Sequence, residues 1–341
     1  MIGPYSEELM IGLSVGCIVL PTIFFALRLW ARRLKHKRLS ADDWLCLLGL
    51  LVAYACCALQ LYATVDGQLG KHQVLGPDGQ PILDDPGFLV YEKTKLAVNV
   101  ISPVGFGLVK ASVIVLYNGI FRNIRLFRWT AYVMLALLCA WSISFFFANL
   151  FICYPVTPLI EPFYNNKCVN EQALFLSTLV TDLIFDILIL AMPVPVVLGL
   201  HLPLRDRLGV LGMFLLGAIV VAVSIARLVQ SLEVNALYRI YTYDMTYLTS
   251  PVFFWANIEL SIAVVSACLP TLKPVLVYFF PPAPAKTQTT STSYAKITDP
   301  EASRHSSKYF AEAGSNSIPL HPVSHLGKDE DPYFPGRNSQ F

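Results

Sequence analysis

Five ionisable side chains lie inside long apolar stretches of the chain, where charges are costly. These residues are Lys110, Asp182, Asp186, Arg227 and Glu259. A charged side chain that faces lipid without a partner costs several kcal/mol, so we expect each of the five to point inward and to pair. Because Asp182 and Asp186 are spaced i, i+4, they share one face of a helix.

Buried carboxylates beside cations can act in three ways within a membrane. They can bind a polar ligand, they can relay protons or cations as acids do in transporters, or they can hold helices together as a polar network. The residue types leave all three alternatives open.

Helical geometry predicts which of these residues meet. A helix rises about 1.5 Å per residue. Counted from the outer end of each apolar segment, Lys110 and Asp186 therefore both lie at a depth of about 20 Å. Asp182 and Glu259 lie at about 14 Å by the same count, whereas Arg227 is near the outer end. We therefore predict a Lys110–Asp186 ion pair. Asp182 and Glu259 would face a cavity open to the outside, with Arg227 at its rim.

Seven apolar segments carry these residues. Hydrophobic residues make up 55% of the chain and charged residues only 14%, whereas soluble domains carry about 25% charged residues. A net charge of +2 also excludes the basic footprint of a nucleic-acid-binding protein. Each segment is long enough to cross about 30 Å of hydrocarbon. The segments are 9–29, 44–64, 96–117, 129–152, 173–198, 209–230 and 250–277.

This pattern predicts an all-α membrane protein, a bundle of seven transmembrane helices. We expect three parts: a short N-terminus over residues 1–8, the transmembrane domain over 9–280, and a tail over 281–341. The tail is rich in Ser, Thr and Pro and cannot bury a core, so we expect it to be disordered.

Lys and Arg are concentrated in the connections after the first, third and fifth segments. The positive-inside rule then places the N-terminus outside and the tail in the cytoplasm. The densest basic cluster follows the first segment and either sets this topology or binds anionic lipid, at about 1 kcal/mol per charge. Its members are Arg32, Arg33, Lys35, Lys37 and Arg38.

Two cysteines, Cys153 and Cys168, fall in the connection between the fourth and fifth segments. This connection lies on the predicted outer, oxidising side, which favours a disulfide over two free thiols. No histidine lies nearby to complete a metal-ligand set, so we predict no metal site there.

Signatures of catalysis are missing from the sequence. We find no nucleophile elbow, no HExxH and no phosphate-binding loop, so we predict a protein that is not an enzyme and needs no cofactor. The seventh segment has no lysine between Pro251 and Thr271 to form a Schiff base with retinal.

Several short motifs occur in a fixed order along about residues 10–275. They are Asp42-Asp43-Trp44; Gly70-Lys71-His72; Lys110-x-Ser112 with Tyr117 and Ile120-Phe121; Cys153-x-Pro155 with Cys168; Asp186 before Pro193-x-Pro195; Phe214-x-x-Gly217 before Arg227; Trp255-x-x-x-Glu259; and Cys268-Leu269-Pro270-x-Leu272-x-Pro274. Together they resemble the fungal group of seven-helix membrane proteins with a rhodopsin-like domain. That group includes pathogenesis-associated receptor-like proteins and members found in natural-product gene clusters.

The topology, the buried charges and the resemblance together predict a receptor-like sensor in the plasma membrane. It would bind a small extracellular molecule, reside in the lipid bilayer and signal to a cytoplasmic protein, with no nucleic-acid partner. Two alternatives are a transporter or proton-coupled carrier, and a non-catalytic membrane component of a fungal biosynthetic pathway.

Overall fold

A computed structural model describes residues 7–34, 36, 38–73, 82, 85–154, 167–195, 204–238 and 245–272. The predicted tail over 281–341 lies outside these residues, as do residues 1–6. The residues within these ranges form the part of the chain that the structure describes.

Seven helices in this part are long and apolar enough to cross a membrane, which confirms the predicted seven-helix bundle. They are α1 (Glu7–Leu34), α2 (Ala41–Val65), α3 (Pro86–Ile120), α4 (Arg125–Leu150), α5 (Glu171–Ala191), α7 (Leu204–Tyr238) and α9 (Ser250–Cys268). Four short elements accompany them: β1 (Cys153–Tyr154), β2 (Lys167–Cys168), α8 (Met245–Leu248) and the 3₁₀ helix η2 (Leu269–Leu272).

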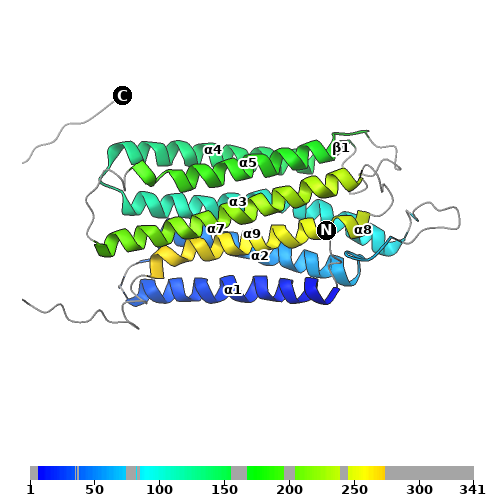
Figure 1. The fold of residues 1–341 in the computed structure, drawn as a ribbon, viewed down its shortest axis with the longest axis horizontal. Helices are drawn as coiled ribbons and strands as arrows, with labels where there is room; N and C mark the ends of the chain where they lie inside the picture. The colour runs from blue at the N-terminus through cyan, green and yellow to red at the C-terminus, as the bar shows by residue number, and fades with distance from the viewer. Residues whose placement is uncertain are drawn as a thin grey trace, which may run out of the picture. The chain divides into compact units, whose positions relative to one another are not determined.

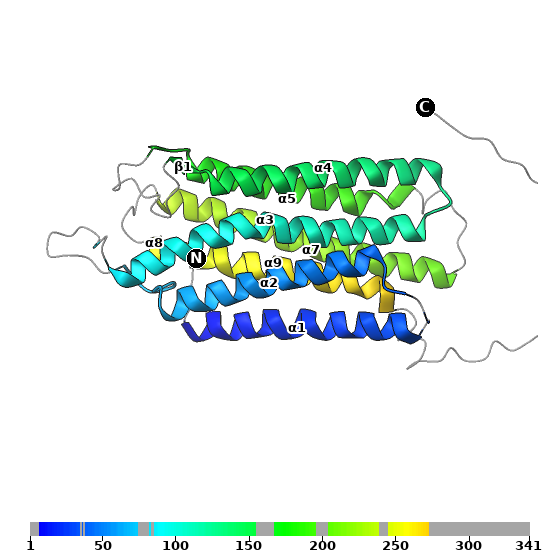
Figure 2. The same ribbon diagram turned by 180° about the vertical axis from the view of Figure 1, so that it is seen from behind.

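The helices run side by side, with α1 along one edge of the bundle and α4 along the opposite edge (Figures 1 and 2). Helix α3 lies inside: 61% of its most apolar stretch is buried, against 22% for α4. A residue on α3 is therefore the best placed to meet several helices at once.

Close contacts of α3 with its neighbours depend on glycine. A Cβ atom added to Gly49 of α2 would lie 2.5 Å from Val109 Cγ2 of α3, and one added to Gly107 of α3 would collide with Ser142 of α4. Small residues at such positions let membrane helices approach closely. They bring the backbones of α2 and α4 close to α3 on separate faces.

Two helices extend well beyond the predicted segments. Helix α3 begins ten residues earlier than expected, because Pro86 occupies its first position and the Asp85 side chain accepts a hydrogen bond from Phe88 N. Helix α7 continues to Tyr238, past the predicted end at residue 230.

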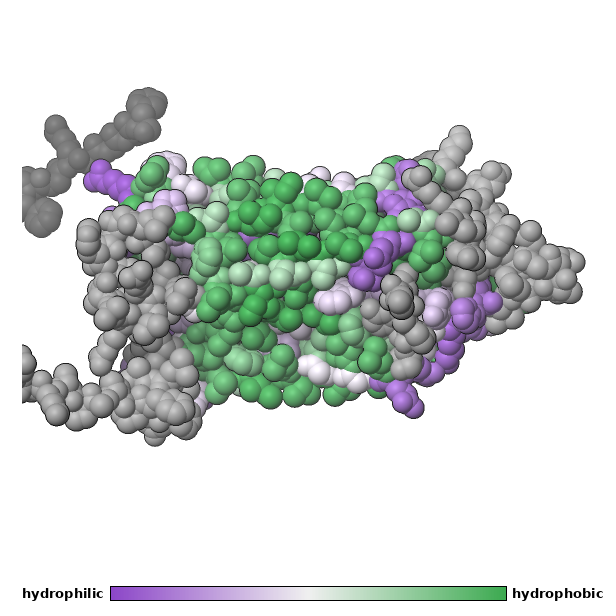
Figure 3. All heavy atoms as spheres, in the orientation of Figure 1, coloured by the Kyte–Doolittle hydropathy of each residue, from purple (hydrophilic) through white to green (hydrophobic). Residues whose placement is uncertain are grey.

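The surface of the bundle fits a lipid environment. Figure 3 shows a broad hydrophobic band over the middle of the helices, with hydrophilic residues toward the ends. Large apolar side chains are exposed along α4, among them Val133, Leu137, Ile143 and Phe147. Such exposure suits hydrocarbon and would be unfavourable in water.

The predicted disulfide is present. Strands β1 and β2 pair antiparallel with Cys153 opposite Cys168, and a disulfide joins the two residues. It ties the end of α4 to the start of α5.

The segment after α2 is fixed against α8. Gly70 N donates to the Thr246 carbonyl oxygen at 3.0 Å, and Thr246 Oγ1 donates to the Lys71 carbonyl oxygen at 2.8 Å. Gly70 has φ of 86°, a conformation that glycine adopts without strain. The His72 ring stacks on Tyr247 with centroids 4.3 Å apart. These contacts give the Gly70-Lys71-His72 motif a structural role at this end of the bundle.

A candidate site of buried charges

Lys110 of α3 contacts both aspartates of α5. Its Nζ atom lies 2.7 Å from Asp182 Oδ1 and 2.9 Å from Asp186 Oδ1, and it also donates to the Asp182 carbonyl oxygen at 2.9 Å. The ammonium group is buried, with 5% of the side chain exposed. The Lys110–Asp186 pair agrees with the depth argument, whereas the sequence did not indicate that one lysine would also serve Asp182.

Arg227 of α7 pairs with Glu259 of α9. Arg227 Nη1 donates to Glu259 Oε2 at 2.6 Å, and the guanidinium carbon lies 4.8 Å from the centre of the Phe106 ring. Arg227 is buried rather than at a rim. The prediction placed it too close to the surface because α7 continues to Tyr238, which puts Arg227 about 16 Å from that end.

Ser224 joins these ion pairs. Its Oγ atom lies 2.8 Å from Asp186 Oδ2 and 2.7 Å from Glu259 Oε1. We call the connected set the polar cluster: Lys110, Asp182, Asp186, Ser224, Arg227 and Glu259. It spans α3, α5, α7 and α9. Ser224 was not predicted from the sequence, although its position one helical turn before Arg227 was an available signal.

The polar cluster is densely charged and buried. Its five charged residues are each at most 7% exposed, and oxygens of Asp182, Asp186 and Glu259 lie within 4.8 Å of one another. Interactions between charges are strong in such an interior, and removal of one partner leaves an uncompensated charge. The cluster therefore joins α3, α5, α7 and α9 through contacts that are costly to break one at a time.

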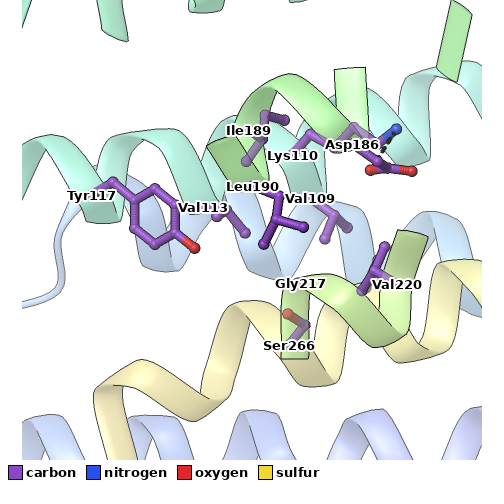
Figure 4. A pocket seen from close by; sticks show the side chains of 11 residues that line it. Val109, Lys110, Val113, Tyr117, Asp186, Ile189, Leu190, Gly217, Val220 and Ser266 are labelled. Atoms are coloured by element: carbon purple, nitrogen blue, oxygen red, sulfur yellow. Dashed lines mark ion pairs between the residues drawn. The ribbon is translucent and has the colours of Figure 1, made fainter. Parts of the chain in front are cut away.

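A small cavity adjoins the polar cluster. It has a volume of about 50 Å³, and Lys110 and Asp186 line it together with Tyr117 and Ser266 (Figure 4). This size suits a few water molecules, whereas drug-sized ligands occupy roughly 300 Å³ or more. Tyr117 and Ser266 lie toward the Ile120 end of α3 and the Cys268 end of α9. The cavity is thus on the side that our orientation assigns to the cytoplasm, opposite to the side where we predicted one.

A second charged group lies near that same end. Arg28 of α1 is fully buried: its Nη2 lies 2.5 Å from Asp42 Oδ2, its Nε lies 2.8 Å from Asp43 Oδ1, and its Nη1 donates to the Ala267 carbonyl oxygen at 2.6 Å. Arg32 also contacts both aspartates. These contacts join α1, α2 and α9. Asp43 also accepts a hydrogen bond from Ser40 N at 3.0 Å, at the start of α2. Its carboxylate therefore contacts both the first turn of this helix and Arg28.

The basic cluster divides in the structure. Arg32 is engaged with the aspartates, whereas Arg33 and Arg38 are exposed. Lys35 and Lys37 lie outside the described residues. Lipid binding by this cluster stays a prediction.

The chain is similar in sequence to several fungal proteins. It is 24% identical over 294 residues to the "Phomoidride biosynthesis cluster protein H" of a fungal species, covering 80% of this chain and 90% of the relative. It is 29% identical to a "SAT4 family membrane protein" of Emericella nidulans, covering 50% of this chain and 42% of the relative. It is 22% identical to the "Receptor GIN3" of Arthrobotrys oligospora, covering 82% of this chain and 65% of the relative. No solved structure matches it.

The family comparison covers most of the helical bundle. The model of the fungal rhodopsin domain matches residues 27–278, from within α1 to beyond η2. This range contains the polar cluster, the Asp42–Asp43 pair and the disulfide. The chain is a membrane protein that belongs to the fungal rhodopsin domain family.

Proposed function

We propose that the protein is a receptor-like sensor of the plasma membrane. A small molecule would act at the outer end of the bundle, and a rearrangement of helices would signal to a cytoplasmic protein. The observation that carries the proposal is the polar cluster, because it links four helices through buried charge contacts. Helices linked in this way move between discrete arrangements rather than by gradual deformation. A relative named as a receptor supports the same function.

A binding measurement with a signalling protein tests this proposal. The full chain in lipid nanodiscs would be incubated with purified fungal heterotrimeric G protein, with and without a non-hydrolysable GTP analogue. We expect association that the nucleotide abolishes, because GTP-bound G proteins leave their receptors. A matched variant, Ser224→Ala, keeps every charged residue and tests whether coupling needs the hydrogen bonds of Ser224 to Asp186 and Glu259. Absence of association with and without extracts of candidate ligands would count against a receptor of this type.

A proton-coupled carrier is the second candidate. Three carboxylates face two cations in the polar cluster, and Asp186 lines the adjoining cavity. In liposomes with an imposed pH gradient, a carrier would move protons, and Asp186→Asn would stop the flux. A flux equal to that of empty liposomes would exclude this function.

A membrane component of a biosynthetic pathway is the third candidate. Its support is that three relatives are named as proteins of biosynthesis clusters. Deletion of the gene would then reduce one secreted product, and expression of a chain with a disrupted polar cluster would fail to restore it. Unchanged product levels would contradict this role.

A further inference from the structure

The bridge at Ser224 needs more hydrogens than the serine supplies. Its Oγ atom lies 2.8 Å from Asp186 Oδ2, 2.7 Å from Glu259 Oε1 and 3.0 Å from the Val220 carbonyl oxygen. A hydroxyl group has one hydrogen to donate, and an ionised carboxylate only accepts. One hydrogen can make a full hydrogen bond to only one of two ionised carboxylates, whereas both carboxylate contacts of Ser224 are short. One of them has to carry a hydrogen of its own.

The charges of the polar cluster point to the same conclusion. Lys110 and Arg227 provide two positive charges, against three negative charges if Asp182, Asp186 and Glu259 are all ionised. An unbalanced charge in this buried setting is costly, and a group in that position tends to become neutral. The Cys56 thiol of α2 also interacts with Arg227, but a thiol carries no positive charge and so does not balance the third carboxylate. One hydrogen on a carboxyl group makes the cluster neutral.

The ion pairs indicate which carboxyl group carries it. Glu259 forms an ion pair with Arg227 at 2.6 Å, and it shares this cation with neither aspartate. Asp182 and Asp186 share Lys110, and Asp182 has the shorter contact as well as the backbone contact. Asp186 is therefore the least compensated carboxylate. We propose that Asp186 binds a proton on Oδ2 and donates it to Ser224, whose own hydrogen goes to Glu259.

The adjoining cavity gives this proton a route. Lys110 and Asp186 line it, with the Tyr117 hydroxyl toward its far end, as Figure 4 shows. A water molecule in the cavity can take the proton from Asp186, which leaves an ionised carboxylate and a hydronium ion. Ser224 then has one hydrogen for two ionised carboxylates and releases one of them. Loss of the proton thus breaks the bridge by which Ser224 of α7 joins Asp186 of α5 to Glu259 of α9, and the protonation of Asp186 controls a link between helices.

This inference goes beyond the proposed function, because it holds whether the protein signals or transports. Its test is infrared spectroscopy of the full chain in lipid nanodiscs, which detects the carbonyl stretch of a protonated carboxyl group. We expect such a band at neutral pH, lost as the pH is raised. It should shift when the aspartate carboxyl carbons are replaced by a heavier isotope. Labelling of glutamate should leave it in place.

Variants then assign the band to one residue. Asp186→Asn should remove it while preserving the fold, because the amide can donate to Ser224 as the protonated carboxyl does. Ser224→Ala should shift it, because the hydrogen-bond acceptor is lost. Glu92→Gln is the matched control: Glu92 is a fully buried carboxylate on α3 that pairs with Lys95 at 3.0 Å, outside the polar cluster. A band that follows the glutamate label, survives Asp186→Asn, or is absent from the native protein overturns the proposal.

Discussion

The effect of replacing a single residue of the polar cluster depends on the buried partner that is then left without its counter-charge. Arg227 and Glu259 are 6% and 2% exposed, and each neutralises the other. By contrast, Lys71 and Glu7 lie 2.8 Å apart with half of the lysine side chain exposed. Solvent screens the second pair, so it adds little to stability, whereas neither member of the first pair can turn to water.

Replacement of one member of the buried pair should therefore cost more than replacement of both. We expect Arg227→Met to destabilise the bundle by about 3–5 kcal/mol, because Glu259 stays buried and uncompensated. The double variant Arg227→Met with Glu259→Leu should recover much of this loss. Thermal unfolding in nanodiscs measures both, with Lys71→Ala as a control that should change stability by less than about 1 kcal/mol. A double variant as unstable as Arg227→Met would show that the two residues do not act as a pair.

The sequence predicted some of this site and missed the rest for physical reasons. Helical rise alone placed Lys110 level with Asp186. The burial of Arg227 depended on where α7 ends, and the apolar pattern that ended the predicted segment at residue 230 does not register the final two turns. Ser224 and Arg28 were not predicted because a serine within a helix, or an arginine in its last turns, occurs in many different structural settings. Only contacts between distant helices distinguish them.

Among the helices, α1 is joined to α2 and α9 by Arg28 at one end of the bundle. The Arg28 guanidinium contacts both α2 aspartates and the Ala267 carbonyl oxygen. Ser112 of α3 also donates to the Asp42 carbonyl oxygen at 2.7 Å. One planar side chain with several donors in a fixed geometry therefore holds three helices, and a fourth contacts the same turn of α2.

The geometry of this contact predicts that lysine cannot replace arginine. Arg28→Lys keeps the charge but loses the planar fork, so some buried acceptors are left without donors. We expect a loss of about 2–3 kcal/mol in unfolding free energy. Arg33→Lys, at an exposed position of the same helix, should have no measurable effect. Equal stability of the two variants would mean that charge alone matters at Arg28.

The link between α4 and α5 gives another prediction for these elements. The disulfide joins residues 15 positions apart, and a loop of that size restricts the unfolded chain by about 3 kcal/mol. Cys153→Ser should lower stability by this order, and reduction of the native protein should do the same. Cys139→Ser is the control, because Cys139 is an exposed free cysteine on α4. A native protein whose unfolding is insensitive to reductant would contradict this expectation.

For the whole molecule, composition was sufficient to predict the fold. Each of the seven apolar segments corresponds to a long helix in the part of the chain that the structure describes, and the family match covers most of the chain. The position of the cavity could not be predicted, because it depends on how side chains from α3, α5, α7 and α9 fill the space between them. Periodicity fixes which residues face inward, but it does not fix where the packing is incomplete.

The orientation of the bundle in the membrane remains a prediction of the charge distribution. With an epitope at each end of the chain, we expect the N-terminal epitope to be labelled on intact cells. The C-terminal epitope should be labelled only after permeabilisation, because Lys and Arg favour the cytoplasmic side. The opposite pattern would reverse the topology and would place the cavity beside Asp186 on the outer side.

The pairing of Lys110 with Asp182 also has a consequence for biosynthesis. The two residues are separated by 72 positions, so α3 leaves the ribosome well before its partner helix exists. At 5–20 residues per second, this interval lasts roughly 4–14 s. During it, the nascent α3 carries an unpaired lysine whose insertion into lipid costs about 3 kcal/mol. We therefore expect the insertion machinery to retain α3 in a sheltered state until α5 arrives, so that the order of synthesis becomes part of how this bundle is assembled.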